Sequence, residues 1–408
     1  MRQTYFPIST IVAVMLVMNL RISILLLTFA TMLVCCTNSD KSQLSNIETI
    51  VFDFDQATES FELYPIFDTI FEAIKLETNK DCIIGEVTKM VFRHDTVFIV
   101  DNVSKSIFLF NDKGKFLSKI CRAGRGRQEY LDLEDVFICD DHILVLDNYQ
   151  FKVCCYDLNG NYRYSFDSKE GIEIMECDGK IFVYSTGGSV WKNHKMVELD
   201  TAGHFISYYL KAKKDEDNID NSYNYDHIIP KRNGFDVLLP IKNIVYTYAD
   251  GELRPSYKID FGKFEMPEDV SRKDLLYFHT NNLQKKYCKG TYKIQEIGRY
   301  RFISSEFNTD IYTLIYDKVQ KRTICISPDT KIGGSGTYIK NYYDNIDSYE
   351  QIGVYFNADF LCMLYRDESF ETKLHGSSAI LYKVAQTLSD TDNGVIIRMK
   401  LKGNDENR

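Results

Sequence analysis

The fold is decided by two stretches of sequence, DTVFIVDNVSKSIFLFNDKGKF at residues 95–116 and DHILVLDNYQFKVCCYDLNGNY at residues 141–162. They align without a gap, 46 positions apart, and Gly114 falls on Gly160. Each stretch alternates short β-rich runs with turn residues, in the order strand, turn, strand, hairpin, strand. A repeat of this length predicts a structural unit that stacks on further copies of itself.

Weaker copies of the same unit continue along the chain. They are GKIFVY with HKMVELDTAGHFISYYL (179–184, 194–210), GFDVLLP with NIVYTYADGELRPSYKIDFG (234–240, 243–262), YRFISSEF with DIYTLIYDKVQKRTICIS (300–307, 310–327), and QIGVYFNADFLCMLY (351–365), which begins a sixth unit. A period in the forties with four strands per unit is typical of a β-propeller. We therefore predict an all-β, six-bladed β-propeller of four-stranded antiparallel blades with short helical insertions.

A closed propeller needs every blade edge to be paired, because an exposed edge strand promotes aggregation. Two strands lie outside the repeats, at residues 47–55 and 393–401. We expect one of them to complete the other's blade. Two further segments interrupt the pattern: the apolar residues of 58–77 suggest a short helix, and 266–290 resembles a helical insertion.

The composition is that of a folded globular chain. The 408 residues are 44% hydrophobic and 26% charged, which excludes disorder for the bulk of the protein. The net charge of −9 argues against nucleic acid as a partner, because phosphate binding needs clustered Lys and Arg. The 28 Tyr and 26 Phe favour half-buried β structure.

The N-terminal region resembles a targeting signal. Residues 11–34 are largely apolar and run directly into Cys35 and Cys36. If translation starts at Met18, a short basic region with Arg21 precedes an apolar stretch and a cysteine, as in a signal peptide. The end of this stretch resembles a bacterial lipobox, which predicts lipid attachment at Cys36, with Cys35 as the next choice. An uncleaved membrane anchor or an ordinary secretory signal is the alternative.

These features predict the domain organisation and the location. Residues 1–36 form the signal peptide with its lipobox, 37–46 a flexible tether, 47–402 the propeller and 403–408 a disordered tail. The protein is then extracytoplasmic and lipid-anchored to the outer membrane, on its periplasmic or its cell-surface face.

Several motifs resemble a known family. They are FDFDQATES and IKLET ahead of the first blade, then FIVDN, LFNDKGKFLSKI and CRAGRGRQEYLDLEDV (121–136). With these motifs the chain looks like the six-bladed β-propeller lipoproteins of Bacteroidota, which are related to NHL-repeat propellers. Arg127-Gln128 replaces the family's usual Pro-Gly pair, and Gly394 its usual Pro. The resemblance implies the fold and the location. The family as a group has no assigned activity, and many members look like binding proteins near glycan-use systems.

The most distinctive binding candidates lie in one loop. They are Arg122, Arg125, Arg127, Glu129 and Tyr130. The resemblance places this loop between the outer strand of one blade and the inner strand of the next, on one face of the disc. Guanidinium groups suit carboxylate and phosphate ligands. The alternative is a tight interblade turn whose charges are solvated or paired with nearby acidic residues.

A second set of candidates is aromatic. Tyr338, Tyr342 and Tyr343 lie in loop-like sequence beside Asn and Asp, a combination suited to holding sugars. Packing between blades is the alternative.

No catalytic or metal-binding motif stands out, and we predict no metal and no cofactor. The sequence has no C-x-x-C, H-x-x-x-H, H-E-x-x-H, G-x-S-x-G or phosphate-binding loop. The recurring Asp101-Asn102 and Asp147-Asn148 pairs suit either a metal-binding repeat or a backbone turn. The nine cysteines after Cys36 are interpreted mainly as buried free thiols, although the compartment permits disulfides.

Two functions follow from these patterns. The first is a lipid-anchored, non-catalytic binding or scaffold protein for a glycan or an outer-membrane protein partner. The second is a lyase or hydrolase with a site in the central channel, which sequence spacing would not reveal. A purely structural subunit of an outer-membrane assembly is a third possibility, and it would expose a broad apolar patch.

Overall fold

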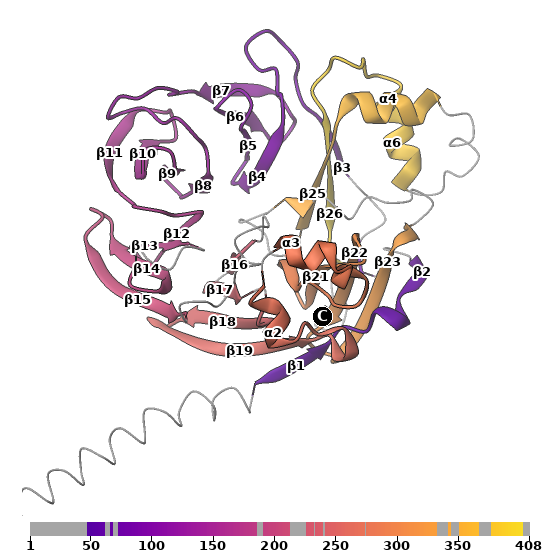
Figure 1. Cartoon of the computed structure of the whole chain (residues 1–408). Coiled ribbons are helices and arrows are strands. Elements are labelled where there is room, and N and C mark those ends of the chain that lie inside the picture. The colour runs from indigo at the N-terminus through magenta and orange to yellow at the C-terminus, as the bar shows by residue number, and fades with distance from the viewer. Residues whose placement is uncertain are drawn as a thin grey trace, which may run out of the picture.

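The two repeats that align best form the first two blades of the computed structural model, which is drawn in Figure 1. Their strands are β4 (Val87–Arg93), β5 (Thr96–Asp101), β6 (Ser106–Asn111) and β7 (Phe116–Ile120), then β8 (Asp135–Ile138), β9 (His142–Asp147), β10 (Lys152–Asp157) and β11 (Tyr162–Asp167). The middle strands are buried on both faces, because other strands and blades surround them. This burial explains why VFIV and ILVL are continuous apolar runs rather than alternating ones.

The next three blades repeat this order. Their strands are β12 (Glu173–Cys177), β13 (Lys180–Tyr184), β14 (His194–Asp200) and β15 (Phe205–Lys211); β16 (Ile228–Lys231), β17 (Gly234–Leu239), β18 (Ile244–Ala249) and β19 (Glu252–Asp260); and β20 (Thr291–Ile297), β21 (Tyr300–Phe307), β22 (Asp310–Asp317) and β23 (Arg322–Ile332). The first strands of neighbouring blades contact one another, from β4 and β8 round to β16 and β20. They therefore line the centre of the ring.

The structure describes most of the chain after the N-terminal segment. The described residues are 47–61, 66–67, 72–185, 191–212, 226–231, 233–239, 241–273, 275–332, 342–343, 351–366 and 377–402. Among them, no helix combines the length and the apolar character that crossing a membrane would require. The predicted signal peptide, tether and C-terminal tail lie outside these residues.

The sixth blade joins the two ends of the described chain. Its strands are β24 (Tyr342–Tyr343), β25 (Gln351–Phe356), β26 (Val395–Lys400) and, from the N-terminal side, β3 (Glu72–Lys75). β26 pairs antiparallel with β3, and β24 contacts β4 of the first blade. A six-bladed, closed ring is thus confirmed, and in Figure 1 β3 lies beside β26 although the two differ in colour.

The structure corrects the predicted closure. The strand predicted at 47–55 does not meet the C-terminal strand: β1 (Glu48–Val51) instead pairs parallel with β19 as a fifth strand of blade four. The predicted helix at 58–77 is also wrong, because the described residues there contain β2 (Thr58–Phe61), which pairs parallel with β23, and β3. Both additions cover outer edges that would otherwise be unpaired. The apolar residues of 58–77 were ambiguous because short apolar runs do not separate strand from helix.

Helices lie outside the blades. The predicted insertion at 266–290 is confirmed by α2 (Glu268–Ser271), α3 (Leu275–Thr280) and the 3-10 turn η4 (Leu283–Lys285). Two other short 3-10 turns are η1 (Phe54–Gln56) and η3 (Gly262–Phe264). The sixth repeat leaves the strand pattern after β25 and continues as α4 (Ala358–Arg366), with α6 (Ser377–Ala385) before β26. These two helices contact each other beside blade six (Figure 1).

The hydrophobic core consists of layers between neighbouring blades. One cluster joins blade one to blade two, with Ile107 and Val145 as members. Another runs from blade two through blade four, and others join blade four to five, five to six and six to one. The nine cysteines after Cys36 are all free thiols, and most of them are buried. Each blade therefore depends on two neighbours for burial of its faces, which explains why the ring must close.

Asn393 stabilises the closure of the ring between blades six and one. Its buried side-chain amide donates hydrogen bonds to the carbonyl oxygens of Glu77 (2.7 Å) and Cys82 (2.6 Å). Its side-chain oxygen accepts a hydrogen bond from the backbone N–H of Ile84 (3.0 Å). One side chain just before β26 therefore satisfies three backbone groups of the segment that leads from β3 into blade one.

We predict that Asn393→Ala destabilises the protein by at least about 2 kcal/mol, because it leaves buried polar groups without partners. Urea unfolding measures this change. The control is Asn159→Ala in an exposed turn, which should stay within about 0.5 kcal/mol of the parent. Equal unfolding midpoints for the two variants would contradict the role of Asn393 in closure.

Candidate functional site

In the loop between β7 and β8, three of the predicted binding residues form hydrogen bonds with the protein itself. The Arg122 guanidinium donates to the carbonyl oxygen of Gly160 through Nε (3.1 Å) and Nη2 (3.0 Å). Tyr130 is buried, and its hydroxyl donates to the carbonyl oxygen of Lys105 (2.9 Å). Burial raises the pKa of Tyr130. The Glu129 carboxylate accepts from the N–H of Gly126 (2.8 Å) within the loop. These three side chains hold the loop in its conformation.

Arg125 and Arg127 behave differently. Both are exposed, and within the described part of the chain neither guanidinium makes a hydrogen bond or an ion pair. The turn between β9 and β10 lies against their loop, because the Gln150 side chain donates to the carbonyl oxygen of Gly124 (3.2 Å). Lys152 donates likewise to the carbonyl oxygen of Gly126 (2.9 Å).

That turn presents two aromatic side chains to solvent. Tyr149 is 74% exposed and Phe151 is 48% exposed. We call Arg125, Arg127, Tyr149 and Phe151 the loop patch. It combines two free guanidinium groups with two exposed rings on the face of the disc that carries the β7–β8 loop.

The other predicted residues lie elsewhere. Tyr342 and Tyr343 form β24, the innermost strand of blade six, where they pair with Val354 and Gly353. This strand belongs to blade six and contacts β4, so the two residues lie in another blade from the turn that carries Tyr149 and Phe151. Tyr338 falls outside the described residues, as do Cys35 and Cys36, so their predicted roles stay predictions.

The repeated Asp-Asn pairs serve as turns. Asp101 and Asp147 are fully buried at the ends of β5 and β9. Asp101 accepts hydrogen bonds from the backbone N–H groups of Val103 (2.9 Å) and Gly85 (2.8 Å). Asp147 accepts in the same way from Leu131 (2.7 Å) and from the turn that follows β9. Each aspartate thus links its own turn, through hydrogen bonds, to the segment that precedes the first strand of the blade. This arrangement favours the turn interpretation over the metal-binding one.

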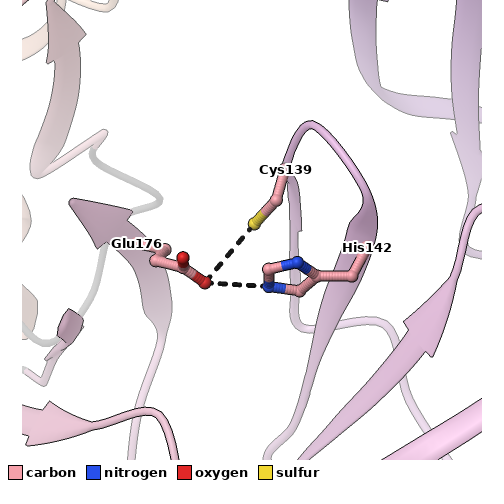
Figure 2. Close-up of side chains that lie close together, drawn as sticks. All are labelled: Cys139, His142 and Glu176. Atoms are coloured by element: carbon pink, nitrogen blue, oxygen red, sulfur yellow. Dashed lines mark hydrogen bonds and ion pairs between the residues drawn. The ribbon is translucent and has the colours of Figure 1, made fainter. Parts of the chain in front are cut away.

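A different cluster is assembled at the other end of blade two. Cys139 and His142 border the tight turn between β8 and β9, and Glu176 lies near the end of β12 in blade three (Figure 2). His142 Nε2 lies 2.8 Å from Glu176 Oε2, and Cys139 Sγ lies 3.6 Å from the same oxygen. One ligand atom from each residue lies within 4.8 Å of the other two. The three side chains are a candidate metal-binding set.

A second carboxylate orients the His142 ring. Nδ1 of His142 lies 2.7 Å from Asp141 Oδ1, so the two ring nitrogens face two different carboxylates. The Arg163 guanidinium donates to Asp141 Oδ2 (2.8 Å) and to the Asp141 carbonyl oxygen (2.9 Å). These hydrogen bonds from His142 and Arg163 lower the pKa of Asp141 to about 2. Burial, and then the negative charge of Glu176, raise the pKa of Cys139.

The motifs that the sequence analysis considered do not include this cluster. Two turn residues separate Cys139 from His142. This C-x-x-H spacing is the one local signal of the cluster in the sequence. Glu176 belongs to another repeat, and no local pattern connects it to the turn. Only the packing of blade two against blade three brings it there.

Polar side chains at the inner strands hold adjacent blades together. Lys89 Nζ lies 2.8 Å from Asp135 Oδ1, which links blades one and two, and the other oxygen of Asp135 accepts from the N–H of Ile174 (2.9 Å) in blade three. Glu173 lies 2.7 Å from Nδ1 of the buried His227 ahead of blade four. Burial raises the pKa of Glu173, opposed by His227. These contacts give Lys89, Asp135 and Glu173 a structural role in joining neighbouring blades.

Comparison with known proteins decides the family. The family model described as "Domain of unknown function (DUF4934)" matches residues 49–400. The chain belongs to this family. No curated protein matches the chain.

Two solved structures are similar to this DUF4934 chain. A candidate exported protein of Bacteroides fragilis NCTC 9343 superposes with a TM-score of 0.68 at 18% identity, covering 87% of this chain and 100% of that one. A DUF4221-family protein of Bacteroides vulgatus has a TM-score of 0.47 at 10% identity, covering 83% of this chain and 98% of that one. At these identities the first likeness supports the propeller fold alone.

We predict that Arg122→Ala lowers the free energy of unfolding by about 1.5–3 kcal/mol, because charged hydrogen bonds to Gly160 are lost. Arg125→Ala should stay within about 0.5 kcal/mol of the parent, because its side chain makes no such contact. Urea unfolding of the two variants checks the division of the loop into structural and free arginines. An equal loss for both would contradict it.

We also predict that Arg163→Gln raises the pKa of Asp141 toward its ordinary value of 3.8. The folded-state pKa lies below the unfolded one, so the contribution of Asp141 to folding is complete above pH 3.8 and is lost as the pH falls toward 2. Carbon-13 NMR titration of the carboxyl group measures the shift. Arg127→Gln, at the opposite end of the blade, is the control and should leave the midpoint unchanged.

Proposed function

We propose that this protein is a lipid-anchored, extracytoplasmic binding propeller that holds an acidic partner protein on its loop patch. The observation that carries the proposal is the contrast within one loop. Arg122, Glu129 and Tyr130 are bound to the protein itself, whereas Arg125 and Arg127 are exposed and free. Guanidinium forks suit carboxylates, and arginine and tyrosine dominate the energetics of protein interfaces.

Phe151 supports the same conclusion. It occupies the left-handed region, with φ of 53°, at a turn position that Lys105 fills in blade one with φ of 51°. A side chain in this region costs about 1–2 kcal/mol. An exposed phenylalanine recovers little of this cost by burial within the chain. An aromatic ring at this position is therefore better explained by contact with a partner than by folding.

The proposed location rests on the sequence before the propeller. The segment that ends in Cys35 and Cys36 resembles a lipoprotein signal, and the family resemblance to Bacteroidota lipoproteins points the same way. Residues 37–46 would then tether the ring to the outer membrane. A carboxylate-bearing glycan is the alternative ligand, because exposed rings stack on sugars and arginine binds their acidic groups.

We predict that the double variant Arg125→Glu and Arg127→Glu reduces partner recovery at least about thirtyfold, because loss of interface hot spots costs 2 kcal/mol or more. Full-length protein is purified from native membranes in mild detergent, and co-purifying proteins are quantified by mass spectrometry. The matched control reverses two exposed lysines in the turn at the other end of β7, Lys113→Glu and Lys115→Glu. Equal recovery from both double variants would contradict the loop patch as the binding surface.

The same preparation tests the anchor. We expect an N-terminal peptide that begins at an acylated Cys36, and we expect Cys36→Ala to release the protein from the membrane fraction. Acylation at Cys35 would move the attachment by one residue. An unmodified N-terminus would overturn the lipoprotein proposal, and recovery of glycan without protein would favour the alternative ligand.

A further inference from the structure

We propose that Cys139, His142 and Glu176 bind a zinc-like divalent cation between blades two and three. This site is separate from the proposed partner surface. His142 begins β9, whereas the turn that carries Tyr149 and Phe151 follows the other end of the same strand. A failure of one proposal would therefore leave the other unaffected.

The donor set selects the class of metal. One thiolate, one imidazole and one carboxylate suit Zn²⁺ and similar borderline cations, whereas Ca²⁺ and Mg²⁺ require several oxygen ligands. Asp140, on the same turn, pairs with Arg93, and Asp141 is held by His142 and Arg163. Neither carboxylate is therefore available to convert the set into an oxygen-rich site.

The spacing of the donor atoms suits tetrahedral coordination. Ligands bonded to zinc at about 2.0–2.3 Å lie about 3.3–3.8 Å apart in a tetrahedron. Cys139 Sγ and Glu176 Oε2 already lie 3.6 Å apart. His142 Nε2, now 2.8 Å from that oxygen, needs to move away by less than about 1 Å. Three protein ligands leave a fourth position, which water would fill.

The charges balance when a cation enters. Nδ1 of His142 faces Asp141, and Nε2 faces Glu176. The cation binds Nε2 and the Cys139 sulfur, so the thiol proton and any proton on Nε2 pass to solvent. The thiolate and the Glu176 carboxylate then supply two negative charges to the divalent ion. Nδ1 keeps its proton and its hydrogen bond to Asp141.

The orientation of the His142 ring and the access of solvent to the cluster also suit a metal site. A histidine ligand whose other nitrogen donates to a carboxylate is the usual arrangement at metal sites, and Arg163 in turn holds that carboxylate. Asp141 is thus a positioning residue. The side chains of His142 and Glu176 are 12% and 19% exposed, so the cluster is reachable from solvent. The bound ion would join the turn of one blade to the inner strand of the next.

Cobalt binding tests the site directly. Full-length protein without a polyhistidine tag is stripped with a chelator and titrated with Co²⁺ under reducing conditions. We expect one equivalent to produce a near-ultraviolet sulfur-to-cobalt charge-transfer band and the visible bands of a tetrahedral ion. Zn²⁺ should abolish these bands by displacement and raise the Tm of the stripped protein. No charge-transfer band, or bands that need several equivalents, would overturn the proposal.

Variants assign the ligands. Cys139→Ser should remove the charge-transfer band, and Glu176→Gln should weaken Co²⁺ affinity at least tenfold. Cys121→Ser is the matched control, because Cys121 is an exposed thiol outside the cluster, and it should leave the titration unchanged. A band that persists in Cys139→Ser and disappears in Cys121→Ser would assign the metal to another thiol and overturn the site.

Asp141→Asn keeps the test decisive if a ligand variant fails to fold. It retains all three ligands and alters only the group behind His142. We expect about ten- to hundredfold weaker Co²⁺ affinity with the charge-transfer band still present at saturation. Circular dichroism verifies the fold of each variant. Unchanged affinity in Asp141→Asn, with a folded protein, would contradict the proposed orientation of the histidine.

Discussion

The antiparallel pairing of β26 with β3 is the interaction on which the whole ring depends. Ile396 pairs with Ile74 in this register although more than three hundred residues separate them in the chain. Closing so long a loop costs conformational entropy, which grows only slowly with loop length. The gain is burial of the faces of blades six and one, whose shared core includes both isoleucines. Asn393 adds hydrogen bonds at the same junction.

Blade two shows how one repeat can carry two unrelated features. Its strands are ordinary members of the ring, and one of their faces packs against blade one in a shared core cluster. Its turns differ in what they expose. The turn after β9 presents Tyr149 and Phe151 beside the free arginines, whereas the turn before β9 places Cys139 and His142 against Glu176. Both proposed sites therefore depend on turn residues, which core packing leaves free to vary.

Much of the fold could be predicted from periodicity, and the errors have a common cause. The repeats at 95–116 and 141–162 became blades because their alternation of apolar runs and turns is a local property. The segments at 58–77 and 358–366 were harder, because short apolar runs suit either a strand or a helix until neighbours are known. Packing against blade five made β2 a strand, and α4 pairs with α6 beside blade six. The helical insertion at 266–290 was predictable because Pro267 and the acidic residues after it mark a helix start locally.

The sequence by itself determined the blade, the number of blades and the turns that Asp101 and Asp147 fasten. It also singled out Arg125 and Arg127, although it could not separate them from Arg122, whose contact with Gly160 comes from the next blade. Only the tertiary structure decided which N-terminal strand closes the ring and which donor joins Cys139 and His142. The physical reason is range: strands and turns follow from neighbours in sequence, whereas closure and the Glu176 contact depend on which blades lie side by side.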